Sequence, residues 1–419
     1  MDSTRSESSR TLRSSSASTT STFVLTPSTS IDGVTALPGL GQPTPPLPTV
    51  PTVPSGPLPV TALSTTSWRT KYPRIGQFAM TESDDIIAAV PSGLLHFKRV
   101  HDHVSKPWSE GRLLPNTAML NDSSVSGLAA ILMRLKNNDS RLYVYCVSGG
   151  TLHNFYRSTK DGSLWVKDSQ SLFPEYPISG TPAVAFSDGY NSQRWSLVVP
   201  SQSGGLLHTS TDGSLSPGSY YSKNSEKVRW EPVNHVAQDL GIISSVSIAM
   251  IKRKKGNGLY PPEEKFVIMV CAAGGRLHTA EGRLSQSSSG YNTSPVKWEA
   301  LAPTRILHPG EVTGNPMLIE GGEQLDLLIP SAGGGVFHFV RTASTPDEWH
   351  MIARIGFPQS LPAASCLAIH SERPYLRARQ FRALIQSGGR LYYVTTPEGS
   401  NPWLGSYLRP IVSPGPFSG

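Results

Sequence analysis

Six copies of a glycine-rich motif each end in a ring that could do chemistry. One copy reads "SGGLLHTS" at residues 203–210, and related runs begin at residues 91, 148, 273, 333 and 387. An imidazole can bind a metal ion, act as a general acid or base, or form buried hydrogen bonds. The six rings, which recur at spacings of 57, 55, 70, 60 and 54 residues, are His96, His153, His208, His278, His338 and Tyr392.

The regular spacing favours a structural role for these rings. Equivalent residues of a repeat lie in separate units, and neighbouring β-sheets pack about 10 Å apart, whereas one metal ion needs its ligands at about 2 Å. Tyr392 keeps an aromatic ring with a polar group but is no base at neutral pH. We therefore predict that the rings are buried, hydrogen-bonded and join one repeat to the next. We predict no metal site and no cofactor.

Arginine and tryptophan form a second constellation. In three repeats an arginine follows the ring and a tryptophan comes eight or nine residues later. An aromatic face packs against the C–H groups of a sugar, and a planar guanidinium donates to its hydroxyls. The candidate ligand-binding residues are therefore Arg99, Trp108, Arg157, Trp165, Arg341 and Trp349. Packing within the repeat is the alternative explanation, because a tryptophan occurs in all six repeats.

Catalytic carboxylates are sparse. A glycoside hydrolase needs two carboxyl groups at a defined separation, and the acids available near the ends of the first strands are Asp188 and Glu320. The sequence contains no Gly-x-Ser-x-Gly, His-Glu-x-x-His or phosphate-loop motif. These observations favour a protein without catalytic activity, with a glycoside hydrolase as an alternative.

The elements that must position these residues are short strands. Apolar runs such as "RLYVYCV" and "KFVIMVC" end at the glycine turn, the motif is the returning strand, and a tryptophan heads a further strand. Within each unit, one more apolar segment precedes these three strands. Each unit therefore holds four strands and no helix. Six such units of about 55 residues are typical of a β-propeller. The fold class is all-β, with six blades favoured and seven possible.

The expected domain boundaries follow from the repeat. Residues 1–62 are rich in Ser, Thr and Pro and are predicted to be disordered. The propeller spans 63–412, with blades near 76–115, 124–173, 178–237, 242–303, 312–358 and 362–411, and residues 413–419 form a flexible end. Residues 67–78 resemble residues 348–359, which leaves open whether they add a strand to the last blade or belong to a seventh.

Four-stranded units with Gly-Gly turns and a closing tryptophan, over about residues 68–412, resemble the fucose-specific lectins, a group of six-bladed propellers. The resemblance implies sugar pockets between adjacent blades, each with an arginine, a carboxylate or amide, and aromatic rings. The three Arg/Trp pairs match part of that pattern. The leading hypothesis is a lectin-like propeller that binds carbohydrate.

Composition bears on location and partners. The N-terminus is polar, no apolar run reaches about eighteen residues, and three cysteines suggest free thiols, so we expect a cytoplasmic protein with no signal peptide and no membrane span. The basic run at residues 252–255 makes nuclear import an alternative. Part of the net charge of +7 comes from the N-terminal segment, and the basic run at residues 252–255 adds four charges. The rest of the chain has mixed charges, so nucleic acid is not an expected partner. Protein partners of this basic loop or of the proline-rich segment 43–54 would instead indicate an interaction scaffold.

Overall fold

The computed structural model describes residues 75–98, 111–134, 140–160, 163–189, 192–211, 230–253, 263–272, 275–283, 296–304, 306, 311–320, 324–332, 335–342, 348–356, 362–372, 380–388, 390–395 and 409–410. The segments 1–62 and 413–419, which the sequence predicts to be disordered, lie outside these residues. Within the described part the secondary structure is β, with one 3-10 turn at Gln238–Leu240.

The strands form six sheets, here called blades I to VI. Blade I holds β1 (Phe78–Met80), β2 (Ile86–Val90), β3 (Gly93–Phe97) and β4 (Arg112–Leu113). Blade II holds β5 (Val125–Arg134), β6 (Ser140–Ser148), β7 (Thr151–Ser158) and β8 (Val166–Lys167). Blade III holds β9 (Ala183–Gly189), β10 (Ser192–Pro200), β11 (Leu206–Ser210) and β12 (Asn234–Val236).

The second half of the ring repeats this layout. Blade IV holds β13 (Ile243–Arg253), β14 (Glu263–Ala272), β15 (Leu277–Arg283), β16 (Lys297–Trp298) and the short β17 (Ala302–Pro303), which also pairs with β15. Blade V holds β18 (Met317–Glu320), β19 (Gln324–Pro330), β20 (Val336–Thr342) and β21 (His350–Ile355). Blade VI holds β22 (Ala364–Glu372), β23 (Gln380–Ser387), β24 (Arg390–Thr395) and β25 (Arg409–Pro410).

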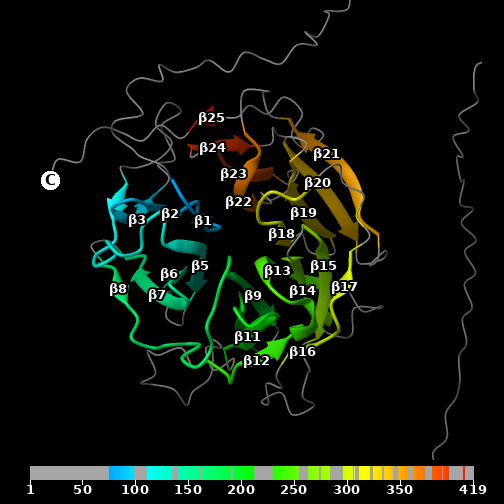
Figure 1. The fold of residues 1–419 in the computed structure, drawn as a ribbon, viewed down its shortest axis with the longest axis horizontal. Helices are drawn as coiled ribbons and strands as arrows, with labels where there is room; N and C mark the ends of the chain where they lie inside the picture. The colour runs from blue at the N-terminus through cyan, green and yellow to red at the C-terminus, as the bar shows by residue number, and fades with distance from the viewer. Residues whose placement is uncertain are drawn as a thin grey trace, which may run out of the picture. The chain divides into compact units, whose positions relative to one another are not determined.

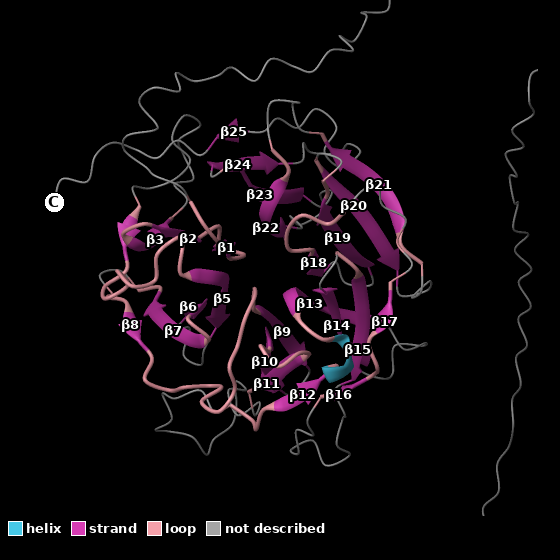
Figure 2. Cartoon of the chain, in the orientation of Figure 1, coloured by secondary structure: helices cyan, strands magenta, loops and turns pink. Residues whose placement is uncertain are grey.

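The blades surround a common centre, and each is built from consecutive antiparallel strands (Figures 1 and 2). The first strands β1, β5, β9, β13, β18 and β22 lie nearest the centre. This arrangement confirms the all-β propeller predicted from the repeat, and the described residues form six blades rather than seven.

The glycine turns join the second and third strands, as the motif predicts. In blade II the hairpin pairs Ser148 with Thr151, so Gly149 and Gly150 are its two central residues. Their φ angles are 57° and 79°, which is the left-handed region that a two-residue turn of this type requires. Glycine adopts this region without the steric cost that a Cβ atom would add.

The hydrophobic core is divided into six clusters, and each cluster lies between two neighbouring blades. One cluster, for example, joins Ile87 and Leu94 of blade I to Val144 and Phe155 of blade II. The remaining clusters repeat this arrangement around the ring. Because a neighbour covers each face of a sheet, the strands carry continuous apolar runs such as β2 instead of alternating ones.

Among the described residues, no strand is shared between blades VI and I, where the ring closes. β1 pairs with β2, and blade VI consists of its own four strands within the described residues. Residues 67–74 lie outside those residues. The Gln386 side-chain amide donates to the Ile75 carbonyl, and a guanidinium N–H of Arg382 donates to Asp84 over 2.5 Å. These polar contacts and one apolar cluster hold the seam.

Long connections lie where the repeat predicts them, between the first and second or the third and fourth strands. Residues 254–262 connect β13 to β14, residues 211–233 connect β11 to β12, and residues 284–296 connect β15 to β16. Lys252 and Arg253 of the basic run lie in β13, opposite Glu264 and Glu263. The other two residues of that run lie outside the described part.

Among the residues that the structure describes, none belongs to a helix long and apolar enough to cross a membrane.

Candidate functional site

The repeated rings lie at the interfaces between blades, and three of them face the following blade. His96 meets Trp165 edge-to-face with ring centroids 5.4 Å apart, and His208 meets Trp298 in the same way at 5.3 Å. His338 makes the corresponding contact with Phe381 at 5.1 Å. Blades I, III and V are therefore joined to blades II, IV and VI through an aromatic edge contact.

The other three rings face the preceding blade. His153 lies opposite Cys146, which belongs to the cluster shared with blade I, and residues opposite each other in a ladder share a face. Tyr392 lies opposite Ile385, which belongs to the cluster shared with blade V. His278 follows Leu277 of the cluster shared with blade V, so it faces blade III. The ring and the leucine or phenylalanine before it recur in all six copies, but the strand is shifted by one residue in alternate blades.

Two of the forward-facing histidines have a carboxylate partner that sequence reasoning missed. Nε2 of His96 lies 2.7 Å from Oδ1 of Asp85, and Nε2 of His338 lies 2.8 Å from Oδ1 of Asp326. Burial acts to raise the pKa of Asp85, but hydrogen bonds from His96 and Ser83 and nearby positive charge outweigh it. The pKa of Asp85 is therefore held below its usual range. Both acids lie two positions before the residue opposite the histidine, a shared feature that an alignment of the copies could have revealed.

His208 is the exception, because neither ring nitrogen has a hydrogen-bond partner among the described residues. The prediction that every buried ring is hydrogen-bonded is wrong here. Ser196 occupies the position that Asp85 and Asp326 hold in blades I and V, and its hydroxyl also has no partner there. Burial, assisted by the positive charge of Arg194, lowers the pKa of His208 to about 3.

The Arg157/Trp165 pair lies at the interface of blades I and II. The guanidinium carbon of Arg157 lies 5.6 Å from the centre of the Trp165 ring, within the range of a cation–π contact. The same tryptophan meets His96, and the charge of Arg157 acts on Asp85. Arg157 and Trp165 are half-buried, and the neighbouring Leu164 is 82% exposed. The interface thus combines a half-buried cation and aromatic ring with a carboxylate that is buried behind them.

Arg341 has a similar local contact but a different environment. Its guanidinium carbon lies 5.4 Å from the centre of the Trp349 ring, and its Nη2 atom lies 3.1 Å from Oε1 of Glu281 in blade IV. Only 4% of Arg341 is exposed. The ion pair between Arg341 and Glu281 therefore joins blades IV and V. The third predicted pair, Arg99 and Trp108, lies outside the described residues.

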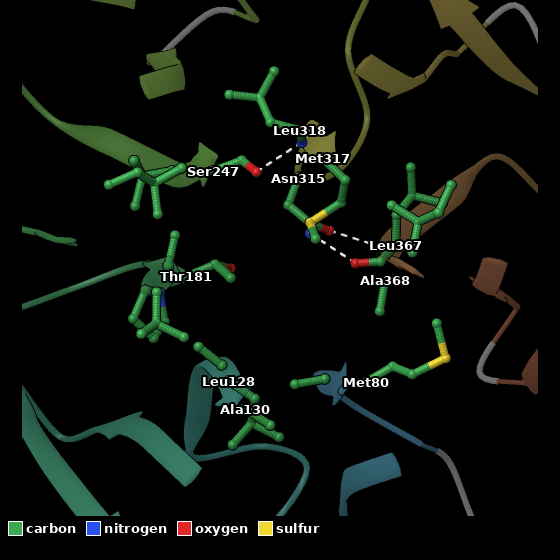
Figure 3. A pocket seen from close by; sticks show the side chains of 18 of the residues that line it. Met80, Leu128, Ala130, Thr181, Ser247, Asn315, Met317, Leu318, Leu367 and Ala368 are labelled. Carbon is green, nitrogen blue, oxygen red and sulfur yellow. Dashed lines mark hydrogen bonds between the residues drawn. The ribbon is translucent and has the colours of Figure 1, made fainter. Parts of the chain in front are cut away.

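A cavity lies at the centre of the ring (Figure 3). It has a volume of about 160 Å³ and is lined by the first strands of all six blades, with side chains that are mostly apolar, such as Met80 and Leu128. Two of its polar side chains are used between blades. The Ser247 hydroxyl accepts from the Leu318 N–H at 2.8 Å, and the Asn315 amide exchanges two hydrogen bonds with the Leu367 backbone. The cavity therefore offers little polar recognition.

The acids considered for glycoside hydrolysis lie near the ends of first strands in blades III and V. Asp188 belongs to β9, and Glu320 is the exposed last residue of β18. They are therefore two blades apart. The part of the chain described here contains no cluster of three or more His, Cys, Asp or Glu side chains that could hold a metal ion.

Solved structures with a similar fold include a fucose-specific lectin. The fucose-specific lectin from Aleuria aurantia is 11% identical, with a TM-score of 0.51, and the match covers 83% of this chain and 99% of the lectin. A variant of that lectin in complex with alpha-methyl-L-fucoside gives 12% identity and a TM-score of 0.52 over the same shares. AofleA from Arthrobotrys oligospora is 11% identical, with a TM-score of 0.51 and coverage of 82% of this chain and 87% of AofleA.

These likenesses show that the chain has the six-bladed propeller fold of this lectin group. No protein-family model matches the sequence, and no curated protein matches it.

Proposed function

We propose that the protein is a non-catalytic, lectin-like propeller that binds carbohydrate at the interface of blades I and II. The observation that carries this proposal is the placement of Arg157 on the half-buried Trp165 beside the Asp85–His96 pair. A sugar needs an aromatic surface for its C–H groups and charged groups for its hydroxyls. This interface supplies the aromatic ring of Trp165 and the guanidinium of Arg157, which rests on that ring.

Arg157 is the residue best placed to contact a ligand. Arg157 is half-buried, and its guanidinium rests on the tryptophan ring. Arg341, by contrast, is engaged with Glu281 and almost fully buried. The proposal therefore rests on one of the three pairs that the sequence indicated.

Arg157→Ala should weaken glycan binding by about ten- to a hundredfold, since a hydrogen bond to a charged group contributes about 1.5–3 kcal/mol. The measurement is a glycan array followed by titration calorimetry with the best glycan. Fucosylated glycans come first, because the Aleuria aurantia lectin variant holds alpha-methyl-L-fucoside.

The matched control is Arg354→Ala. Arg354 also lies over an aromatic ring, with its guanidinium carbon 5.3 Å from the centre of the Phe337 ring, but it is exposed on β21 of blade V. Its replacement should leave glycan affinity unchanged. An array on which the wild-type protein retains no glycan at high concentration would refute the proposal, as would equal losses in the two variants.

A further inference from the structure

Three blade interfaces share a histidine that contacts an aromatic ring of the next blade, and one of these histidines has no aspartate partner among the described residues. At blades I/II, III/IV and V/VI a histidine faces the ring of the next blade. In blades I and V the residue two positions before the one opposite the histidine is an aspartate, and it bonds to the ring. In blade III that residue is Ser196, two positions before Val198, which lies opposite His208.

Among the residues described around His208, no acid is bonded to either ring nitrogen. Glu231 lies on this face of blade III, but both of its carboxylate oxygens are engaged with other groups. Its Oε1 lies 3.1 Å from Nη2 of Arg194, and its Oε2 accepts from the Ser210 hydroxyl at 2.5 Å. From blade IV the facing groups are His278, whose Nδ1 has no partner among the described residues, and the Trp298 indole, which can only donate. The apolar side chains of the shared cluster complete the interface.

We propose that the interface between blades III and IV is an acid-sensitive joint, which opens when His208 takes up a proton while the interfaces I/II and V/VI stay closed. The inference does not depend on sugar binding. An imidazolium beside Asp85 or Asp326 gains a charged partner. The same charge on His208 would be buried against Arg194, with no carboxylate to balance it.

The direction of the pH dependence follows from linkage. The closed interface holds His208 neutral, with its pKa lowered to about 3, while an opened interface returns it to the ordinary value near 6.5. The closed state is therefore fully favoured above about pH 6.5 and loses stability as the pH falls toward 3. Well below pH 6.5 each pH unit multiplies the open population by about ten, which amounts to about thirtyfold between pH 7.5 and pH 5.0.

The strands that the joint holds together carry long connections. His208 lies in β11, which leads into residues 211–233, and Trp298 lies in β16, which follows residues 284–296. Acidification would therefore loosen the support of these two connections. The remainder of the ring keeps its backbone hydrogen-bond ladders.

Hydrogen exchange measured by mass spectrometry at pH 7.5 and pH 5.0 tests the joint. After correction for intrinsic exchange rates, peptides covering β11 and β16 of the wild-type protein should lose about thirtyfold in protection at pH 5.0. Peptides covering β20 and β23 of the interface V/VI should not. Loss of protection across the whole protein, or none in β11, would overturn the proposal.

Two variants make the test specific to the missing acid. Ser196→Asp supplies the carboxylate present in blades I and V, and His208→Phe removes the titrating group but keeps a ring against Trp298. Both should abolish the local pH effect, and both should show wild-type circular dichroism at pH 7.5. Retention of the effect in His208→Phe would assign it to another group and refute the joint.

A reciprocal variant covers the case in which Ser196→Asp fails to fold. Asp85→Ser should create the same acid sensitivity at blades I/II, visible in peptides covering β3. Nuclear magnetic resonance of His208 gives an independent readout. A native His208 that titrates near 6.5 would contradict the proposal.

Discussion

His338→Phe is expected to destabilise the protein by about 3–5 kcal/mol at neutral pH. The His338 and Asp326 side chains are both 0% exposed, and their Nε2 and Oδ1 atoms lie 2.8 Å apart. Phenylalanine keeps a ring against Phe381 but removes the histidine from a buried carboxylate, which still accepts from the Gln324 side-chain amide at 3.3 Å. The loss arises mainly from the carboxylate left behind, because desolvation of a charge is costly unless a partner compensates it. The free energy of unfolding in urea is the measurement.

The matched control is His208→Phe, which changes the same position of the repeat in blade III. His208 has no hydrogen-bond partner among the described residues, so phenylalanine removes buried polar atoms without orphaning an acid. The variant should be as stable as the wild type or more stable by about 1 kcal/mol at pH 7.5. Equal destabilisation by the two substitutions would show that ring shape, rather than the acid partner, controls these interfaces.

Gly180→Ala is expected to cost about 3 kcal/mol, from left-handed backbone strain and overpacking together. Gly180 has a φ of 62°, and a Cβ atom there would overlap the carbonyl oxygen of Ser244 in the next blade. The backbones meet at this point, because Thr181 N–H donates to the Ser244 carbonyl at 3.1 Å and Val246 N–H donates to the Thr181 carbonyl at 3.3 Å. Neither blade can yield without breaking these bonds.

Gly149→Ala separates the two costs. Gly149 also has a positive φ, at 57°, but a Cβ atom there would meet nothing within 4 Å. This variant should lose only the conformational part, about 1–2 kcal/mol. The comparison of the two urea midpoints gives the steric cost of the contact between blades. Equal midpoints would mean that blades III and IV do not approach as closely as the structure shows.

The blade architecture could be predicted from the sequence because its signals are local. Runs such as β6 are apolar and β-branched or aromatic, and a glycine turn follows each at a regular distance. Strand order in a propeller then follows from chain order. The contacts that close the ring could not be predicted from the sequence. Gln386 and Arg382 bond to Ile75 and Asp84, which lie 311 and 298 residues earlier in the chain.

The direction of the repeated rings is reflected in one neighbouring position of the motif. A shift of one residue turns a side chain to the other face of its sheet. The residue two positions before the ring is apolar in the copies that face the following blade and polar in those that face the preceding one; these residues are Leu94, Leu206 and Val336 against Thr151, Arg276 and Arg390. His96 and His153 face opposite ways along the ring, and the meaning of this difference becomes clear only when the neighbours in the core are known.

The Arg/Trp pairs illustrate a second limit. Arg157 and Arg341 have the same relation to their tryptophans in sequence and similar distances to them in space. Their environments differ because Glu281, from the preceding blade, pairs with Arg341. Such a partner lies 60 residues away along the chain, and a motif within one repeat carries no information about it.

The alternating faces make the pair of blades, rather than the single blade, the module from which this ring can be rebuilt. Removal of blade II alone would place His96 against the face of blade III that carries Leu207 and Trp230 and that packs on Tyr145 of blade II, rather than against Trp165. Removal of blades I and II together would preserve the matching of every remaining face. Shortening, duplication or transplantation of this scaffold should therefore succeed in steps of two repeats.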